Sequence, residues 1–222
     1  FNDKLRNIEA FDFIERFFVK GLSMRHIVIG DDFRFGRGGK GDYNLLCEAG
    51  QRLGFSVESA PTYSIDNERV SSSRIRTLLE QSEFEQAARL LGSDYTISGK
   101  VVYGQRLART IGAPTANVEL RRLRTALSGV YEVEARIEGE TQWLPAVANI
   151  GTRPTVNDSI KAVLEVHIFD FSKTIYGRRI TVRFRHKIRD EQKFESIDEL
   201  KTNILRDVKT AQTWFSLQSN SN

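Results

Sequence analysis

The chain has 222 residues, of which 40% are apolar and 28% charged, and its net charge of +4 is modest and evenly spread. This composition predicts a globular protein of one large or two small domains, compatible with small anionic ligands and too weakly basic to indicate nucleic-acid binding. Cys47 is the single cysteine and no apolar run is long enough to cross a membrane, so we expect no internal disulfide, no membrane partner and a cytoplasmic location.

The amino-terminal third has the alternation of an α/β domain. Apolar residues at helical spacing from Phe11 to Leu22 predict a first helix. The run Ile27–Gly30 is typical of a buried parallel strand. A helix over residues 43–53 and a strand over 55–58 complete a β-α-β pattern.

A glycine-rich segment follows the first strand and matches two phosphate-binding patterns only in part. Gly36-x-Gly38-x-x-Gly41 has the glycine spacing of a dinucleotide-binding turn, but five residues separate Gly30 from Gly36. Such a turn must follow its strand at once, which argues against a dinucleotide site. Lys40 precedes a glycine rather than Ser or Thr, so the segment is not a P-loop either. From the residues alone, it is interpreted as a flexible basic loop.

Two further helices are predicted before residue 93. Ser71–Arg76 opens the first of them, and its hydroxyls either cap the helix or, together with two arginines, hold a phosphate at the helix N-terminus. Ser82 and Glu85 have the spacing of a capping box for the second helix, and Gly92 ends it. This second helix is interpreted as structural.

The rest of the chain is rich in strands. Strand-like stretches with short connections predict an antiparallel barrel or sandwich, and they cover residues 95–103, 130–137, 143–150, 162–171 and 180–186. A helix follows, capped by Ser196 and Glu199. Its apolar stripe from Ile197 to Phe215 predicts packing on the barrel wall, with binding of a partner as the alternative.

The strand over 162–171 places a carboxylate on its outer face. Leu164, Val166 and Ile168 alternate with Glu165 and His167, so the first set points into the core and the second outward. A solvated surface glutamate is the simple interpretation of Glu165. The outer face also carries apolar residues, which indicates that it is covered, and a carboxylate at the edge of such a cleft can accept a proton from an attacking alcohol. His167 is interpreted as structural, because no orienting partner is evident.

The segment that follows the first strand of this region carries the most distinctive chemistry. Gly104 breaks the strand into a loop that contains Arg109 and turns at Gly112, and the loop leads to Thr115 and Asn117. Glycines allow close backbone approach, arginine attracts anions, and two neutral oxygens suit a hard cation that already carries phosphate. The segment therefore predicts a site for a metal-bound nucleotide, with an ordinary basic surface loop as the alternative.

The same segment resembles the signature of the riboflavin kinases. The matching residues are Gly99-x-Val101-x-x-Gly104 and Arg109-Thr-Ile-Gly112-x-Pro114-Thr115-Ala116-Asn117, followed in the family's order by Gly129-Val-Tyr131, Ala148-Asn-Ile-Gly151-x-Arg-Pro-Thr155, Leu164-Glu-Val-His167, Ile175-Tyr-Gly177 and Ile188-Arg-Asp-Glu-Gln-Lys-Phe194. One departure is Ala108, where the family usually has glycine. Residues further upstream resemble part of the adenylyltransferase half of the bacterial bifunctional riboflavin kinase/FMN adenylyltransferases, also called FAD synthetases.

The resemblance implies two domains. Residues 1–92 would be part of a Rossmann-like nucleotidyltransferase domain, and residues 93–222 a closed Greek-key barrel with a C-terminal helix. The second domain would transfer the γ-phosphate of ATP to the 5′-hydroxyl of riboflavin, giving FMN and ADP. The partners implied are these small molecules, with FAD added for the parent enzyme. The alternative is a flavin- or nucleotide-binding module without catalysis.

The resemblance also implies roles for individual residues of the barrel. Thr115 and Asn117 would bind Mg²⁺ and the phosphates of ATP. The loop from Gly104 to Gly112, with Arg109, would wrap the phosphates. Glu165 would take the proton of the hydroxyl, and Arg189 would offset charge near the flavin.

In the first domain, the resemblance identifies residues of an adenylyltransferase site. Asp32, Phe33 and Phe35 match its flavin-side loop, and Ser71, Ser72, Ser73 and Arg76 match its second phosphate-binding motif. The His-x-Gly-His motif that steadies ATP in adenylyl transfer does not occur in this sequence. We therefore expect this polypeptide not to convert FMN into FAD.

Overall fold

The structure is a computed structural model that describes residues 2–30, 32–104, 113–120, 125–154 and 160–219. The chain divides into two compact units, Phe1–Val70 and Ser71–Asn222.

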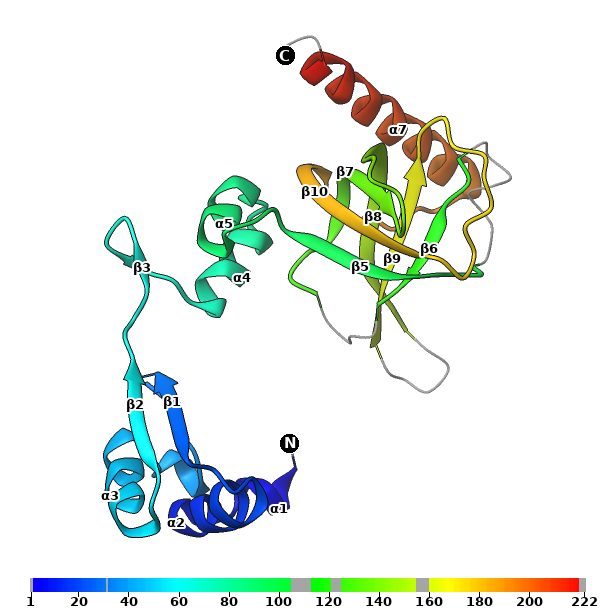
Figure 1. Ribbon diagram of the computed structural model, residues 1–222. Coiled ribbons are helices and arrows are strands. Elements are labelled where there is room, and N and C mark those ends of the chain that lie inside the picture. The colour runs from blue at the N-terminus through cyan, green and yellow to red at the C-terminus, as the bar shows by residue number, and fades with distance from the viewer. Residues whose placement is uncertain (1, 31, 105–112, 121–124, 155–159, 220–222) are drawn as a thin grey trace. The chain divides into compact units, whose positions relative to one another are not determined.

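The first unit is a small α/β layer (Figure 1). Its helices and short strands are α1 (Asp3–Arg6), α2 (Ala10–Phe13), the π-helical continuation η1 (Ile14–Gly21), β1 (His26–Gly30), the 3-10 turn η2 (Arg37–Gly39), α3 (Tyr43–Leu53), β2 (Ser56–Ala60), β3 (Ser64–Ile65) and β4 (Glu68–Arg69). β1 and β2 are parallel, with His26 opposite Ser56. The predicted β-α-β pattern is confirmed, because α3 connects two parallel strands and buries Leu46 and Ala49 in a core that they share with the strands and with α2 and η1.

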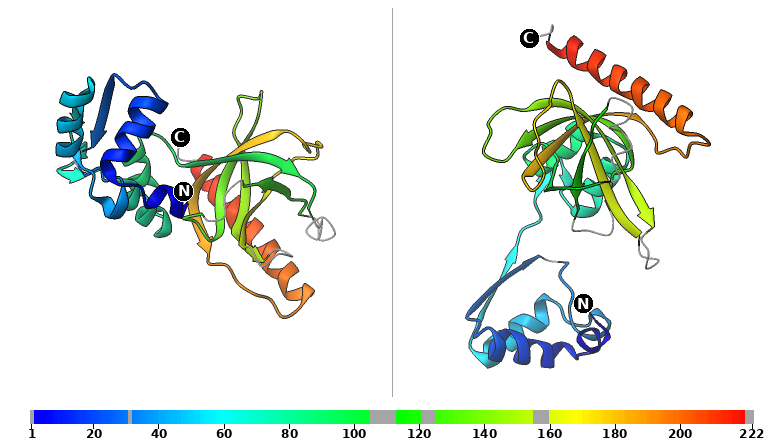
Figure 2. Two further views of the ribbon diagram at one scale, coloured as in Figure 1. Left: turned by 90° about the horizontal axis from the view of Figure 1, so that it is seen from below. Right: turned by 90° about the vertical axis from the view of Figure 1, so that its right-hand side faces the viewer.

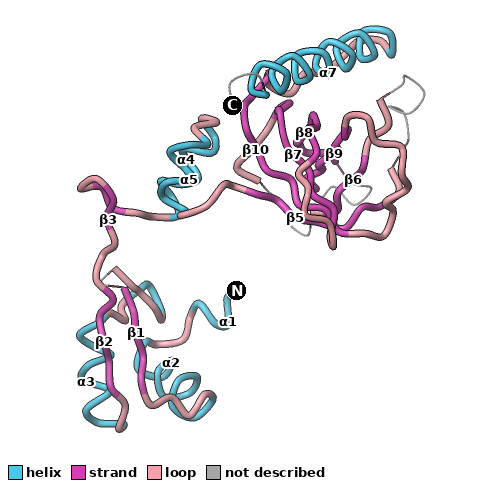
Figure 3. The backbone as a smooth tube through the Cα atoms, turned by 45° about the horizontal axis from the view of Figure 1, so that its top comes forward, coloured by secondary structure: helices cyan, strands magenta, loops and turns pink. Residues whose placement is uncertain are grey.

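The second unit is a closed antiparallel barrel with helices on its outside (Figure 3). Its elements are α4 (Ser72–Glu80), α5 (Phe84–Leu91), β5 (Thr96–Val102), β6 (Ala116–Glu119), β7 (Gly129–Ile137), β8 (Leu144–Pro154), β9 (Ile160–Ile168), β10 (Arg179–Arg189) and α7 (Ile197–Ser219). The strands follow the order β10-β5-β6-β9-β8-β7, and β7 pairs with β10 to close the barrel. The order β10-β7-β8-β9 is a Greek key, as the resemblance implied.

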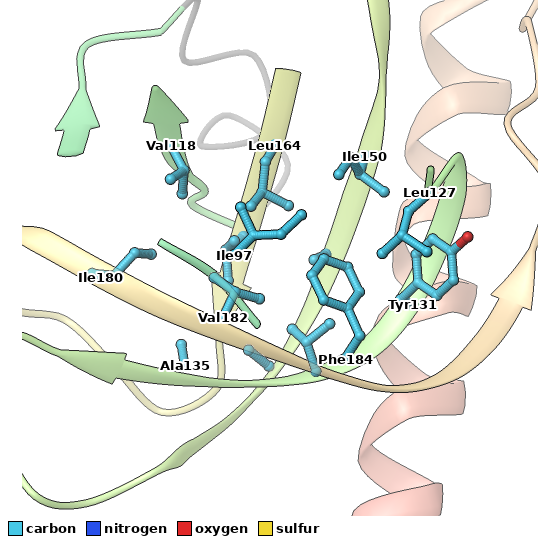
Figure 4. Packing of buried hydrophobic residues seen from close by; sticks show 14 of the residues in the cluster. Ile97, Val118, Leu127, Tyr131, Ala135, Ile150, Leu164, Ile180, Val182 and Phe184 are labelled. Carbon is cyan, nitrogen blue, oxygen red and sulfur yellow. The ribbon is translucent and has the colours of Figure 1, made fainter. Parts of the chain in front are cut away.

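Every second side chain of each strand points into the barrel and fills its interior. Figure 4 shows Ile97, Val118, Leu164 and Val182 pointing toward one another from different strands. All four are almost completely buried. Side chains at the alternate positions therefore lie on the outer wall, as expected from the strict period of two in a strand.

The division into compact units differs from the division at residue 92 that the sequence predicted. α4 and α5 belong to the second unit because Leu78, Leu79, Phe84 and Ala87 are part of the hydrophobic core of the barrel. Phe84 packs edge-on against Tyr131, with 5.8 Å between the ring centroids. The two helices thus plug one end of the barrel, although their sequence pattern continues that of the α/β half.

Two of the three predicted helix caps are present in the structure. Ser71 caps α4, since its Oγ accepts from the backbone N–H of Arg74 at 3.2 Å. Ser196 caps α7 in the same way, and accepts from the backbone N–H of Glu199 at 3.1 Å. The predicted capping box at Ser82 is wrong. Ser82 adopts a left-handed conformation, with φ of 63°, and the N-cap of α5 is the next residue, Glu83, which makes no side-chain capping hydrogen bond.

Helix α7 lies along the outer wall formed by β7, β8 and β10 (Figure 2). Val208 and Ala211 of the helix pack on Val130 and Val147 of the wall, which confirms the predicted docking of the apolar stripe. Ile197, the first residue of the predicted stripe, does not pack on the wall, since 65% of its surface is exposed. Among the described residues, no helix is both long and apolar enough to cross a bilayer.

A carboxyl group is buried on the wall that α7 covers. Glu132 of β7 is only 2% exposed, and its Oε2 has no hydrogen-bond partner among the described residues. His186 of the neighbouring strand places Nδ1 3.3 Å from this oxygen. Burial raises the pKa of Glu132 to about 7 from an ordinary value of 4.5, because the apolar surroundings disfavour the charged form.

We expect this carboxyl to make folding stability fall as the pH rises. The folded state keeps the proton up to about pH 7 and the unfolded state releases it near pH 4.5, so the free energy of unfolding declines between these values, by about 3 kcal/mol in all. Glu132→Gln removes the cost of ionisation. Urea unfolding should show the variant about 2 kcal/mol more stable than the native protein at pH 8, with most of the gain lost at pH 5.

Glu134 provides the control on the same strand and the same face. Its carboxylate accepts a hydrogen bond from Arg183 Nε at 2.9 Å, so Glu134→Gln should give no gain at pH 8. A gain for Glu132→Gln that does not depend on pH would show that ionisation of Glu132 is not its cause.

Candidate active site

Three polar side chains lie side by side on the outer wall of the barrel. In the strand register, Asn117 of β6 stands opposite Glu165 of β9, and Glu165 stands opposite Asn149 of β8. The residues adjacent to them along the strands, such as Val118 and Leu164, point into the core. The alternation therefore places the two amides and the carboxylate on one outward surface, where all three line a single cavity of about 270 Å³.

The facing wall of this cavity comes from α7 and from the segment that precedes it. Leu200, Ile204 and Val208 give it an apolar surface, and Phe194 lies at its edge. The strand residues supply polar groups on one side and the helix supplies apolar ones on the other. Such a cavity suits a ligand with a flat apolar ring system and a polar chain.

A buried ion pair fixes the position of Arg189 in this cavity. Its Nε lies 3.1 Å from both carboxylate oxygens of Asp207 on α7, and its Nη2 lies 2.7 Å from Oδ2. The arginine side chain is 16% exposed and the aspartate 6%. The guanidinium also lies 5.5 Å from the centre of the Phe194 ring. The pair has no net charge, so Arg189 offers oriented N–H donors rather than a free positive charge.

A second cavity, of about 350 Å³, begins on the other side of Thr115 and Asn117, which line both cavities. Gly104 lines it from the end of the first barrel strand. A Cβ atom at Gly104 would lie 2.2 Å from Nδ2 of Asn117. Only glycine allows the backbone to approach the Asn117 amide this closely.

The structure therefore brings together Gly104, Thr115, Asn117, Glu165 and Arg189 of the predicted kinase site. Arg109 and Gly112 lie outside the described residues. The sequence did not indicate that Asn149 and Asp207 also line the site. Asp207 had a visible signal, since it is a carboxylate inside the apolar stripe of a helix.

His167 has a partner that the sequence did not reveal. Its Nδ1 lies 2.9 Å from the backbone oxygen of Pro114, and its ring packs edge-on against Phe169, with 5.7 Å between centroids. The interpretation of His167 as a residue without an orienting partner is wrong. The reason is that Pro114 is 53 positions away in sequence and reaches His167 only through the β6–β9 pairing.

The predicted adenylyltransferase residues are distributed over the two units. In the first, Asp32 forms an ion pair with Arg69 at 2.6 Å, and Phe33 stacks on the buried Phe35, with 5.6 Å between centroids. The glycine-rich segment closes on itself, since Phe35 and Gly41 form an isolated bridge.

In the second unit, Ser71 caps α4 and the Oγ of Ser72 accepts a hydrogen bond from Nη2 of Arg76 at 3.1 Å. The Ser73 carbonyl accepts from the hydroxyl of Thr77. These bonds agree with the capping interpretation of the serines, and phosphate binding stays a prediction. Within the described part of the chain, no cluster of three or more His, Cys, Asp or Glu side chains is arranged to hold a metal ion.

Comparison with known proteins identifies the family. The riboflavin kinase family matches residues 91–215, and the FAD synthetase family matches residues 1–74. The bifunctional riboflavin kinase/FMN adenylyltransferase of Pseudomonas fluorescens is 49% identical over 212 residues, which are 96% of this chain and 68% of that protein. The enzyme of the same name from Escherichia coli K12 is 47% identical over 217 residues, which are 98% of this chain and 69% of the Escherichia coli enzyme. The chain belongs to this family.

A solved structure shares the fold of most of the chain. The crystal structure described as a macrolide-efflux protein from Streptococcus pneumoniae superposes with a TM-score of 0.67 at 31% identity, covering 96% of this chain and 68% of that one. The six-stranded barrel and its C-terminal helix are thus the riboflavin kinase domain of a bifunctional riboflavin kinase/FMN adenylyltransferase. The first unit is part of its nucleotidyltransferase-like domain.

Proposed function

We propose that this chain transfers the γ-phosphoryl group of ATP to the 5′-hydroxyl of riboflavin, giving FMN and ADP, and that Glu165 and Asn117 are at the centre of the site. The observation that carries the proposal is their direct pairing on neighbouring strands, with one cavity on each side of the Thr115–Asn117 segment. Two substrates must meet at one point for phosphoryl transfer, and two cavities that share a wall provide such a point.

The cavity under α7 takes riboflavin. Its apolar helix wall and Phe194 suit the isoalloxazine ring, and the Arg189 donors, fixed by Asp207, suit the polar edge of that ring. The ribityl chain then extends along the wall of amides toward Glu165. ATP takes the second cavity, which Gly104, Thr115 and Asn117 line and where the close packing of Gly104 on the Asn117 amide holds that side chain at the boundary with the flavin cavity.

Thr115 and Asn117 are proposed as the protein ligands of a Mg²⁺ ion that accompanies ATP. A hydroxyl and an amide oxygen are hard neutral donors, and Mg²⁺ in kinases takes few protein ligands because phosphate and water supply the rest. Both residues line the boundary of the two cavities, so the donor set fits. The bound ion would supply charge neutralisation on the phosphates.

Glu165 acts as the general base. As the riboflavin 5′-oxygen forms its bond to the γ-phosphorus and the bond from that phosphorus to the β–γ bridging oxygen breaks, the hydroxyl proton passes to the Glu165 carboxylate. The amides of Asn117 and Asn149 lie on the neighbouring strands and restrict where the carboxylate can point. The proposed kinase domain is residues 93–222, and the proposed partners are riboflavin, FMN, ATP and ADP in the cytoplasm.

The test is direct. The protein is incubated with riboflavin and MgATP and the products are separated by chromatography, with parallel reactions that omit ATP or contain excess EDTA. FMN should appear only in the complete reaction. Binding of riboflavin without any FMN would instead support the non-catalytic flavin-binding alternative. The same chromatogram resolves FAD, which we expect not to form because the sequence has no His-x-Gly-His motif.

A further inference from the structure

One hydrogen bond ties the proposed metal-binding segment to the strand of the proposed base. Nδ1 of His167 lies 2.9 Å from the carbonyl oxygen of Pro114. A carbonyl oxygen only accepts hydrogen bonds, so Nδ1 must carry the proton and donate it. His167 lies two residues from Glu165 on β9, and Pro114 immediately precedes Thr115.

The bond stands where the backbone pairing of β6 and β9 ends. The ladder runs from Glu119 opposite Val163 to Ala116 opposite Val166. Continued by one step, the register would place Thr115 opposite His167. The backbone pairing has ended at that point, and the His167 imidazole binds the Pro114 carbonyl oxygen instead. Proline has no N–H to contribute to a ladder, so a side-chain donor that takes its carbonyl is an available way to hold this position.

The imidazole is itself held in place from two sides. Its ring packs edge-on against Phe169, and Phe169 packs edge-on against Phe215 of α7, with 6.3 Å between those centroids. The backbone of His167 pairs with Val147 of β8. The His167 imidazole, which donates to Pro114, is therefore packed at the interface between the barrel and α7. It is not a freely rotating surface side chain.

We propose that His167 is a positioning residue of the kinase reaction: its Nδ1–H holds the Pro114 carbonyl, and thereby keeps the Thr115 hydroxyl beside the Asn117 amide, on the wall that the two cavities share, in the geometry that binds the metal–nucleotide. The inference rests on the proposed function. Thr115 precedes the first residue of β6, and the imidazole bond fixes the backbone on its N-terminal side.

A pair of amide variants tests this role. In asparagine the side-chain nitrogen is as many bonds from Cα as Nδ1 is in histidine, so His167→Asn keeps a donor within reach of Pro114. In glutamine the nitrogen corresponds to Nε2, so His167→Gln loses that donor although it has the same polar group. We expect the KM for MgATP to rise about tenfold or more in His167→Gln and to stay within about threefold of the native value in His167→Asn.

The affinity for riboflavin distinguishes a positioning role of His167 from a general loss of structure. The affinity for riboflavin, measured by quenching of flavin fluorescence, should change by the same factor in both variants, because both remove the same imidazole from the lining of the flavin cavity and both leave its α7 wall intact. Equal KM values for MgATP in the two variants would overturn the proposal, and so would a loss confined to thermal stability. If the native protein forms no FMN, the proposed function fails, and the same comparison made with MgADP binding by calorimetry still decides the role of His167.

A measurement on the native protein covers the case in which a variant does not fold. Long-range ¹H–¹⁵N NMR spectra distinguish the two neutral imidazole tautomers. With three histidines in the chain, the His167 signals are assigned by their absence from the spectrum of His167→Asn, or by elimination with variants at His26 and His186. The neutral ring should carry its proton on Nδ1. A proton on Nε2 would mean that the bond to Pro114 is not made, and would overturn the proposal.

Discussion

Replacing Glu165 by glutamine should lower kcat for riboflavin phosphorylation by about 10² to 10⁴-fold, the range that a general base contributes. Glutamine has nearly the size of glutamate and keeps an oxygen that accepts hydrogen bonds, but it cannot take a proton from the attacking hydroxyl. The substitution changes neither the apolar α7 wall nor the ion pair of Arg189. Binding of FMN, followed by its fluorescence, should therefore stay within about twofold of the native value.

The control for this variant is Glu138→Gln. Glu138 follows β7 at the opposite end of that strand from the site and is exposed, so the substitution removes the same charge without touching either cavity. It should leave kcat unchanged. Turnover in Glu165→Gln equal to that of the native protein would remove Glu165 from the chemistry, although its place beside Asn117 would remain.

The sequence was sufficient wherever a local pattern decides the structure. The period-two alternation around Leu164 and Val166 placed Glu165 on the outer face, and both apolar residues are fully buried. Residues 43–53 were predicted as a helix and form α3 with the same bounds. β6 was less visible, because only four residues pair and an alternation that short is not distinctive.

The sequence was not sufficient where distant segments meet. Whether α4 and α5 cover the barrel depends on a site for Phe84 beside Tyr131, which is a matter of tertiary packing. The bond from His167 to Pro114 depends on the β6–β9 register. Arg189 was expected to offset charge near the flavin, and the sequence did not indicate that its partner is Asp207, 18 positions further along the chain. No local pattern encodes these three partnerships.

The partnership of Arg189 and Asp207 leads to the second large effect. Asp207→Asn should destabilise the protein by about 3 kcal/mol or more, because the substitution leaves the mostly buried guanidinium without its counter-charge. The same change should raise the KM for riboflavin, since Arg189 loses the anchor that aims its donors into the cavity and α7 loses a contact with the end of β10. Urea unfolding and steady-state kinetics measure the two effects.

Two further variants distinguish the effect of the buried charges from the effect of α7 docking. Asp198→Asn removes an exposed carboxylate from the same helix and should change stability by less than about 1 kcal/mol, the size of a helix-dipole contribution. The double variant Arg189→Met with Asp207→Leu removes both buried charges and should recover most of the stability, yet it should still bind riboflavin weakly because the donors are gone. If Asp207→Asn leaves both stability and the KM for riboflavin unchanged, the ion pair does not orient Arg189. Recovery of riboflavin binding in the double variant would instead show that α7 docking alone shapes the cavity, since an apolar pair can dock the helix but cannot donate a hydrogen bond.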